Sequence, residues 1–249
     1  MGNVFYAPGK QRAAKVGDLF ASIAGRYDLL NDLQSFGLHR LWKRRVVQLA
    51  AVKAGDRALD LCCGTGDIAL ALAGRGAETI GLDFSPRMLE IAKARRPSAF
   101  QNQNPKWLQG DASQVPFPDN SFDAVTVGYG LRNLSSWQTG LDEMVRVAKP
   151  GGRIVVLDFG KPANRLWREI YFTHLRCSVP LIGLLFCGNA QAYAYILESL
   201  KHYPAQAGVE EKMRERKLES LRCITFFGGA MAINFGVKTA WKPLRPAGA

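Results

Sequence analysis

Small and acidic residues gather at 59–69, where the chain runs LDLCCGTGDIA. Gly64, Gly66 and Ala69 satisfy the spacing G-x-G-x-x-G/A, and Asp83 follows about 20 residues later. Glycines at these positions let the backbone approach a ligand closely, while the free N–H groups that start a helix bind its polar part. A carboxylate at Asp83 accepts hydrogen bonds from both hydroxyls of a ribose. The spacing predicts a turn that binds a nucleoside.

Acids at other positions indicate which nucleoside this is. Asp60 stands just before the turn, where it would repel a pyrophosphate but attract an ammonium group. Asp111 and Ala112 follow a further apolar run, where an acid accepts from an adenine amino group, and Gly128 opens a loop. S-adenosylmethionine carries an amino group and a sulfonium and no phosphate. We therefore expect this cofactor, although the glycine spacing alone leaves an NAD-dependent oxidoreductase open.

Short apolar runs that alternate with helical segments must position these residues. We predict strands at 57–61, 78–82, 105–109, 122–127 and 153–158, with helices at 67–73, 86–95 and 137–148. This alternation predicts a parallel sheet, wound with helices on both faces. Open sheets of this kind bind ligands where the strands end, so Asp60, Asp83, Asp111 and Gly128 should share one edge.

The segments before and after these strands do not follow the same strand–helix alternation. Two helices at 12–30 and 38–52, joined by a loop, precede the sheet, and AKPGGR at 148–153 ends a helix and turns into a strand. The aromatic-rich stretch 161–206 is helical. LRCITFFGGAMAINFGVK at 221–238 predicts two antiparallel strands around a Gly-Gly turn.

Length and composition limit the classes of protein to which this chain can belong. The 249 residues, 47% of them hydrophobic, suit one domain, and no apolar run reaches the roughly 20 residues that cross a bilayer. No secretory signal is evident at the start, and five cysteines without metal-ligand spacing favour a reduced, cytoplasmic protein without a metal. The net charge of +12 favours anionic partners or is a solvated surface. Without an aromatic platform, we expect no nucleic acid.

Four segments carry a family resemblance: LDLCCGTGDIA, GLDFSPRML, GDASQVPFPDNSFDAVTVGYGLRN and EMVRVAKPGGRIVVLDFGKP. They resemble the class I S-adenosylmethionine-dependent methyltransferases. YDLLNDLQSFGLHRLW at 27–42 and GYGLRN at 128–133 resemble more narrowly the ubiquinone/menaquinone biosynthesis C-methyltransferases. That family usually has an aliphatic residue where Gln34 stands, and Glu-Phe-Ser where this chain has Asp158, Phe159 and Gly160.

The resemblance implies an α/β fold: a doubly wound, seven-stranded, mostly parallel Rossmann-like sheet with an antiparallel C-terminal hairpin. It implies a single methyltransferase domain, comprising N-terminal lid helices (1–53), a cofactor-binding core (54–160), a helical substrate cover (161–210) and the hairpin (211–249). The cofactor-binding residues that we expect are Tyr27, Asp60, Gly64, Thr65, Gly66, Asp83, Phe84, Asp111, Ala112 and Gly128.

The implied reaction is methylation of a ring carbon on a prenylated demethylquinol, with demethylmenaquinol as the leading acceptor. Such a carbon becomes nucleophilic when a neighbouring hydroxyl loses its proton, so the site needs a proton acceptor or a cation beside the oxyanion. Arg132 is the expected cation; the alternative is that it caps a helix or pairs with Asp142. Asn133 would orient the ring oxygen or cap the turn.

Three further aromatic or basic residues have two interpretations each. Tyr27 packs beside the sulfonium or belongs to the core, and Tyr129 lines the ring pocket or belongs to the core. His39 is a base or a packed histidine. Cys62 and Cys63 are interpreted as small apolar residues rather than reactive thiols.

Partners follow from the implied substrate. The aromatic stretch would cover a channel for the isoprenoid tail, unless it is ordinary helix core, and basic residues would hold the protein at an anionic membrane, on its inner face. A homodimer is also expected. The open alternatives are a methyltransferase for another small acceptor, such as a phenol, sterol, tRNA base or ubiquinone precursor, an NAD-dependent oxidoreductase, and a binding module without activity. The absence of Asn-Pro-Pro-Tyr after the fourth strand argues against a nitrogen acceptor.

Overall fold

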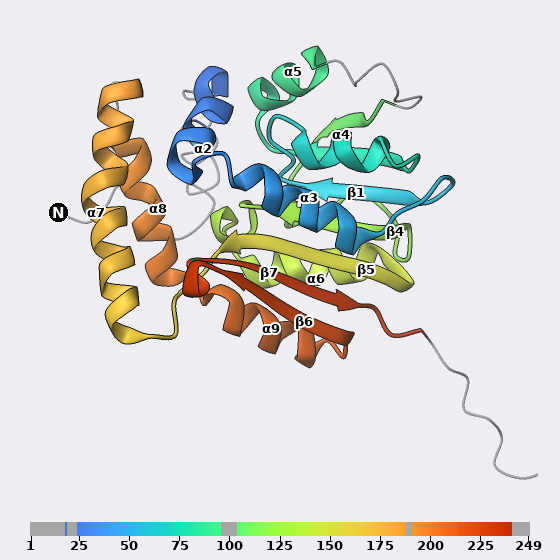
Figure 1. Cartoon of the computed structure of the whole chain (residues 1–249). Coiled ribbons are helices and arrows are strands. Elements are labelled where there is room, and N and C mark those ends of the chain that lie inside the picture. The colour runs from blue at the N-terminus through green and yellow to red at the C-terminus, as the bar shows by residue number, and fades with distance from the viewer. Residues whose placement is uncertain (1–17, 19–23, 96–103, 188–190, 241–249) are drawn as a thin grey trace, which may run out of the picture.

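A seven-stranded sheet forms the centre of the computed structural model, which describes residues 18, 24–95, 104–187 and 191–240 (Figure 1). The order of its strands is β3-β2-β1-β4-β5-β7-β6. Their bounds are β1 Arg57–Leu61, β2 Glu78–Asp83, β3 Lys106–Gln109, β4 Phe122–Gly128, β5 Ala148–Phe159, β6 Glu219–Phe226 and β7 Met231–Val237. β1 to β5 pair in parallel, whereas β7 runs antiparallel to both β5 and β6. The predicted α/β fold class with its C-terminal hairpin is confirmed.

Helices cover both faces of the sheet and one of its ends (Figure 1). The helical segments described are η2 Ala24–Arg26, α2 Tyr27–Ser35, α3 His39–Ala50, α4 Asp67–Ala73, α5 Pro86–Ala94, η3 Leu131–Asn133, α6 Trp137–Val147, α7 Arg165–Cys187, α8 Gln191–His202, α9 Ala205–Glu215 and η4 Phe227–Gly229. α3 and α4 pack on one face, and α6 and α9 pack on the other. α7 and α8 lie side by side beyond the carboxyl ends of the parallel strands. Within the described ranges, no helix combines the length and hydropathy that a membrane span requires.

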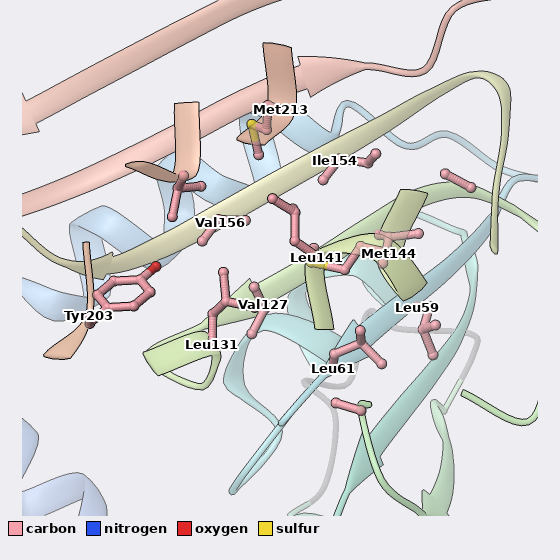
Figure 2. Packing of buried hydrophobic residues seen from close by; sticks show 14 of the residues in the cluster. Leu59, Leu61, Val127, Leu131, Leu141, Met144, Ile154, Val156, Tyr203 and Met213 are labelled. Carbon is pink, nitrogen blue, oxygen red and sulfur yellow. The ribbon is translucent and has the colours of Figure 1, made fainter. Parts of the chain in front are cut away.

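Alternation along the strands explains the two cores. In β1, Leu59 and Leu61 are buried with Met144 of α6 and Met213 of α9 (Figure 2). Ala58 belongs to the opposite core, which α3 and α4 cover. Because side chains along a strand alternate between its faces, Asp60 also lies on the α3/α4 face. The strand therefore places a carboxyl group between apolar positions.

The predicted boundary between the first helix and the loop after it was wrong. Residues 31–35, predicted as a loop, continue α2, which ends where Phe36 takes a left-handed φ of 49° and its N–H bonds to Asp32 O. The helix continues because no glycine or proline interrupts it before Gly37. The earlier part of the helix predicted at 12–30 falls mostly outside the described residues.

β5 begins at Ala148 rather than at 153, because Ala148 already pairs with Phe122 ahead of a register shift. Gly151, with a φ of +79°, supplies the left-handed position within AKPGGR. α9 spans residue 210, which we predicted as the boundary between cover and hairpin, and it packs against β6 and β7.

Gly66 tests how tightly the turn after β1 is packed. A Cβ on Gly66 would stand 2.4 Å from Cη2 of Trp107, at a φ of +88°, whereas a Cβ on Gly151, at a similar φ of +79°, meets nothing within 4 Å. We expect Gly151→Ala to lower the free energy of unfolding by about 1 kcal/mol through backbone strain. Gly66→Ala should lower it by about 1–3 kcal/mol more, since Trp107 must also move. Urea denaturation measures both, and equal losses would show that the ring yields freely.

Candidate functional site

A cleft of about 790 Å³, partly open to solvent, lies where β1, β2, β3 and β4 end. We call it the strand-end cleft. Its lining comprises Tyr27, Cys62, Gly64, Leu82, Asp83, Phe84, Ser85, Met88, Gly110, Asp111, Ala112, Ser113, Gly128, Tyr129, Gly130, Asn133, Leu134 and Ser135. Residues predicted from the ends of four strands, β1 to β4, thus line one cleft, together with Tyr27 and two residues from the loop after β4.

Asp83 is held by the backbone on both sides of its carboxylate. The N–H of Gly64 donates to Oδ2 at 2.7 Å, and the N–H of Ser85 donates to Oδ1 at 2.9 Å. Burial raises the pKa of Asp83, and these N–H groups lower it. Each carboxylate oxygen has a further lone pair, so the group can still accept from two hydroxyls. Phe84, next to it on the cleft wall, is 48% exposed and offers its ring to a planar base.

Asp60 is the buried acid of the site. The register of β1 with β4 pairs it with Thr126, whose hydroxyl donates to Oδ1 at 2.7 Å. Burial raises the pKa of Asp60 to about 7, although Thr126 and Lys43 lower it. Asp60 lines a smaller cavity of about 320 Å³, which shares Tyr27 and Gly64 with the strand-end cleft. Thr65 lines the same small cavity.

Two ion pairs and a hydrogen bond hold the glycine-rich turn. Asp67 accepts from Lys43 Nζ of α3 at 2.6 Å and from Arg95, just after α5, at 2.5 Å. Although burial raises the pKa of Asp67, these two cations keep it below its usual range. Thr65 Oγ1 donates to Asp28 of α2 at 2.8 Å. Gly66 caps α4 and packs against Trp107. It lines neither the strand-end cleft nor the small cavity beside Asp60.

Lys43 was not among the residues predicted from the sequence. Its partner Asp67 is 24 residues away, and no local spacing relates the two. The interpretation of Cys62 and Cys63 as apolar residues agrees with the structure, because burial raises the pKa of both thiols far above the usual value.

The loop after β4 is held in a strained conformation. Tyr129 has a φ of +62°, which side-chain-bearing residues seldom adopt. Arg132 and Asn133 both fix this residue, since their side chains donate to the Tyr129 carbonyl oxygen at 2.8 and 3.1 Å. Strain of this kind is common where a backbone positions a functional group.

Arg132 is buried rather than presented to the cleft. Its guanidinium donates to Asp158 Oδ1 at 2.6 Å and lies over the ring of Phe159, 4.6 Å from the centroid. The partner that we offered as the alternative, Asp142, is wrong: Asp142 pairs with Arg216 at 2.6 Å. Arg132 does not line the strand-end cleft, nor does it line the second, apolar hollow that is described next. Its contact with an acceptor stays a prediction.

A second hollow, of about 1250 Å³ and partly open to solvent, shares the lining residue Tyr129 with the strand-end cleft. We call it the apolar cavity. It is lined by Asn31, Gln34, Ser35, Phe36, Leu38, His39, Trp42, Tyr129, Phe159, Trp167, Ile170, Tyr171, His174, Leu175, Phe227, Ala230 and Met231. α2, α3, α7 and the β6–β7 connection each contribute, so the stretch predicted as a cover does line a hollow. The wrong loop boundary concealed Asn31 and Gln34 in the sequence.

Comparison with known proteins identifies the family. The ubiE/COQ5 methyltransferase family matches residues 9–238. A protein of Azotobacter vinelandii named ubiquinone/menaquinone biosynthesis C-methyltransferase is 39% identical over 93% of this chain and 92% of its own length. A protein of the same name from Ectopseudomonas mendocina is 39% identical over 93% of this chain and 91% of its own.

The chain belongs to the ubiE/COQ5 methyltransferase family. It is an S-adenosylmethionine-dependent C-methyltransferase, which decides against the NAD-dependent alternative. Among solved structures, a Thermotoga maritima S-adenosylmethionine-dependent methyltransferase aligns with a TM-score of 0.60 at 20% identity, covering 90% of this chain and all of the other. The cyclase SpnF aligns with a TM-score of 0.58 at 21% identity, covering 94% and 98%. These two structures show the shared fold alone.

The residues of this methyltransferase fit the cofactor. Asp83 offers two oxygens for ribose hydroxyls, and Phe84 and Asp111 stand beside it for the base. Asp60 offers a buried carboxyl group for the amino group, with Tyr27 on the same small cavity. No cluster of three His, Cys, Asp or Glu suited to a metal occurs within the described ranges.

The raised pKa of Asp60 predicts a pH-dependent cofactor affinity. Below about pH 7 the carboxylate gains a proton and no longer attracts an ammonium group, so affinity should fall by up to about tenfold for each pH unit. Calorimetric titration with S-adenosylmethionine between about pH 8 and pH 6 measures the slope. Asp60→Asn should bind weakly at every pH, with this slope lost. Asp142→Asn, which removes an exposed carboxylate paired with Arg216, should keep it; a slope retained in Asp60→Asn would contradict the assignment.

Proposed function

We propose that this enzyme methylates a ring carbon of a prenylated demethylquinol, with demethylmenaquinol as the leading acceptor. The observation that carries the proposal is that the two hollows share Tyr129: an apolar cavity large enough for a bicyclic ring lies on one side of the residue that also lines the cleft suited to the cofactor. The names of the Azotobacter and Ectopseudomonas relatives, which cite ubiquinone and menaquinone biosynthesis, support the same class of acceptor.

The chain mainly has to align two reactants. When bound, S-adenosylmethionine supplies an electrophilic methyl group, so catalysis rests on holding the ring carbon in line with it. Asp83 and Asp60 would fix the two ends of the cofactor, and Tyr129 would lie between cofactor and ring. Asn133 lines the strand-end cleft and donates to the Tyr129 carbonyl oxygen. From this position it would orient the ring oxygen.

The rim of the apolar cavity suits an isoprenoid tail. Four residues of its lining are large, apolar and exposed: Phe36 at 91%, Trp167 at 39%, Ile170 at 51% and Phe227 at 55%. Exposed apolar residues gathered at the mouth of a cavity mark a contact surface rather than ordinary helix core. We propose that the tail leaves the cavity here and that this rim touches an anionic membrane, assisted by the net charge of +12. A homodimer stays a prediction.

Turnover with defined acceptors tests the function. Purified enzyme, S-adenosylmethionine and a short-tailed demethylmenaquinol kept reduced should yield a product heavier by one methylene group, detected by mass spectrometry. A demethylated benzoquinol with the same tail, a sterol and a simple phenol serve as comparison acceptors. Binding of the cofactor without methylation of either quinol would overturn the proposal.

Vesicle binding tests the rim. A Phe36→Ser, Ile170→Ser double variant should co-sediment with phosphatidylserine-containing vesicles at least about tenfold less than the unchanged protein, because each side chain loses about 1.5 kcal/mol of burial. Leu41→Ser, which removes an exposed leucine outside the cavity lining, should bind normally. Binding should also weaken in high salt. If the double variant sediments as the unchanged protein does, the rim is not the membrane contact.

A further inference from the structure

His39 lines the apolar cavity and has one ring nitrogen, Nδ1, without a hydrogen-bond partner among the described residues. Its Nε2 lies 2.8 Å from Asp32 Oδ1, and Arg40 donates to both oxygens of the same carboxylate at 2.9 and 2.6 Å. Arg40 and His39 lower the pKa of Asp32 to about 2, so Asp32 is ionised and can only accept. A neutral His39 must therefore carry its proton on Nε2. Its Nδ1 keeps a lone pair.

That lone pair has nothing to bind among the described residues. Nδ1 of His39 is buried without a hydrogen-bond partner there, in a side chain that is 4% exposed and lines the apolar cavity. The amide nitrogen of Gln34 and the hydroxyl of Tyr129 are likewise buried in the lining without a partner from the described part of the chain. Buried polar groups are rarely left unsatisfied in native proteins. The three unpartnered atoms therefore indicate that the apolar cavity binds a ligand that carries oxygen atoms.

We propose that the Asp32–His39 pair is the general base of this enzyme: Nδ1 accepts the proton of a ring hydroxyl on the acceptor, and Asp32 fixes the tautomer. This rests on the proposed function for the identity of the ring. The assignment goes beyond the proposed function because it names His39 as the proton acceptor. It also requires that the molecule that receives the methyl group carry a free hydroxyl. A fully oxidised quinone offers only carbonyl oxygens, which cannot donate to Nδ1. The site thereby selects the reduced ring.

Protons and electron pairs balance in this step. The hydroxyl proton moves to Nδ1, and the electron pair that remains is delocalised onto the neighbouring ring carbon. That carbon forms a bond to the methyl group as the carbon–sulfur bond breaks, with the electron pair of that bond going to sulfur. The hydrogen on the methylated carbon leaves as a proton to water, which restores the aromatic ring as a phenolate. The imidazolium returns its proton to the phenolate oxygen, so one proton is released per methyl transferred.

Burial outweighs the charges around His39 and lowers its pKa, which keeps the side chain neutral near pH 7. Burial lowers its pKa most, the bond to Asp32 raises it, Lys43 lowers it and Asp67 raises it. Tyr129, Tyr171 and His174 face the same cavity from the loop after β4 and from α7. Since the pKa falls below its usual value near 6.5, the base form predominates at neutral pH and is lost on acidification.

Kinetics of His39→Leu tests the role. Arg40 still holds Asp32 in this variant, so no carboxylate is stranded. We expect kcat for the short-tailed quinol to fall by about 100-fold or more, with S-adenosylmethionine affinity within a few-fold of the unchanged protein. The acid limb of the pH profile of kcat should disappear, provided that S-adenosylmethionine is saturating at every pH so that protonation of Asp60 does not contribute. Asp32→Asn should lower kcat less and move that limb to lower pH, because it removes a carboxylate that raises the pKa of His39.

His202→Leu is the matched control. His202 is exposed on α8 beside Glu198, so this variant should keep the full rate and the acid limb. If His39→Leu also keeps both, the proposal is overturned. An unchanged acid limb accompanied by a lower rate would assign His39 a packing role and would equally overturn it.

A binding measurement keeps this inference separate from the identity of the substrate. Trp42 and Trp167 line the apolar cavity, so their fluorescence reports its occupation. With S-adenosylhomocysteine present, 1,4-dihydroxynaphthalene should bind about tenfold more tightly than its dimethyl ether, which lacks the hydroxyl protons. The preference should vanish in His39→Leu. Should no quinol be methylated while this preference holds, the proposed function fails and the assignment of His39 as hydroxyl acceptor survives. Equal binding of the two ligands by the unchanged protein would refute the assignment.

Discussion

The buried ion pair between Arg132 and Asp158 joins the loop after β4 to the end of β5. Both side chains are 4% exposed, and removing two charges from water is costly unless further hydrogen bonds satisfy them. Here the backbone N–H of Arg132 also donates to Asp158, and the guanidinium donates to the Tyr129 carbonyl. Loss of one partner from a pair of this kind typically costs about 3–5 kcal/mol. The pair thus holds Tyr129, which lines both hollows, in its left-handed conformation.

The two hollows are coupled through the helices that precede the sheet. α2 contributes Asp28 to the glycine-rich turn and Gln34 to the apolar cavity, while α3 contributes Lys43 to the turn and His39 to the cavity. A shift of either helix therefore changes cofactor and acceptor contacts together. This linkage suits an enzyme that must align two reactants within a few tenths of an ångström.

Much of the lining of the strand-end cleft was predictable because its signals are local. Parallel strands put their ends at one edge, so the acids of three successive strands could be assigned to that edge from the sequence alone. Asp60 needed only the alternation along β1. The partner of Arg132 was not predictable, since Asp158 lies 26 residues away on a neighbouring strand. α2 was cut short because its end depends on Phe36 adopting a left-handed φ, for which Phe is not a usual signal.

The apolar cavity was predicted only in part: the aromatic stretch was expected to cover a hollow, but the contributions of α2 and of the β6–β7 connection were not expected. Its walls come from helix faces and from the β6–β7 connection, whose orientation follows from packing rather than from strand register. Such walls can change residue by residue without disturbing the sheet that holds the cofactor. Gln34 illustrates the consequence: an amide stands where the family usually has an aliphatic side chain, and its nitrogen is buried in the lining without a partner among the described residues. A buried amide favours an acceptor that has an oxygen atom beside Gln34. We therefore expect this part of the cavity wall to distinguish acceptors that differ in ring substitution.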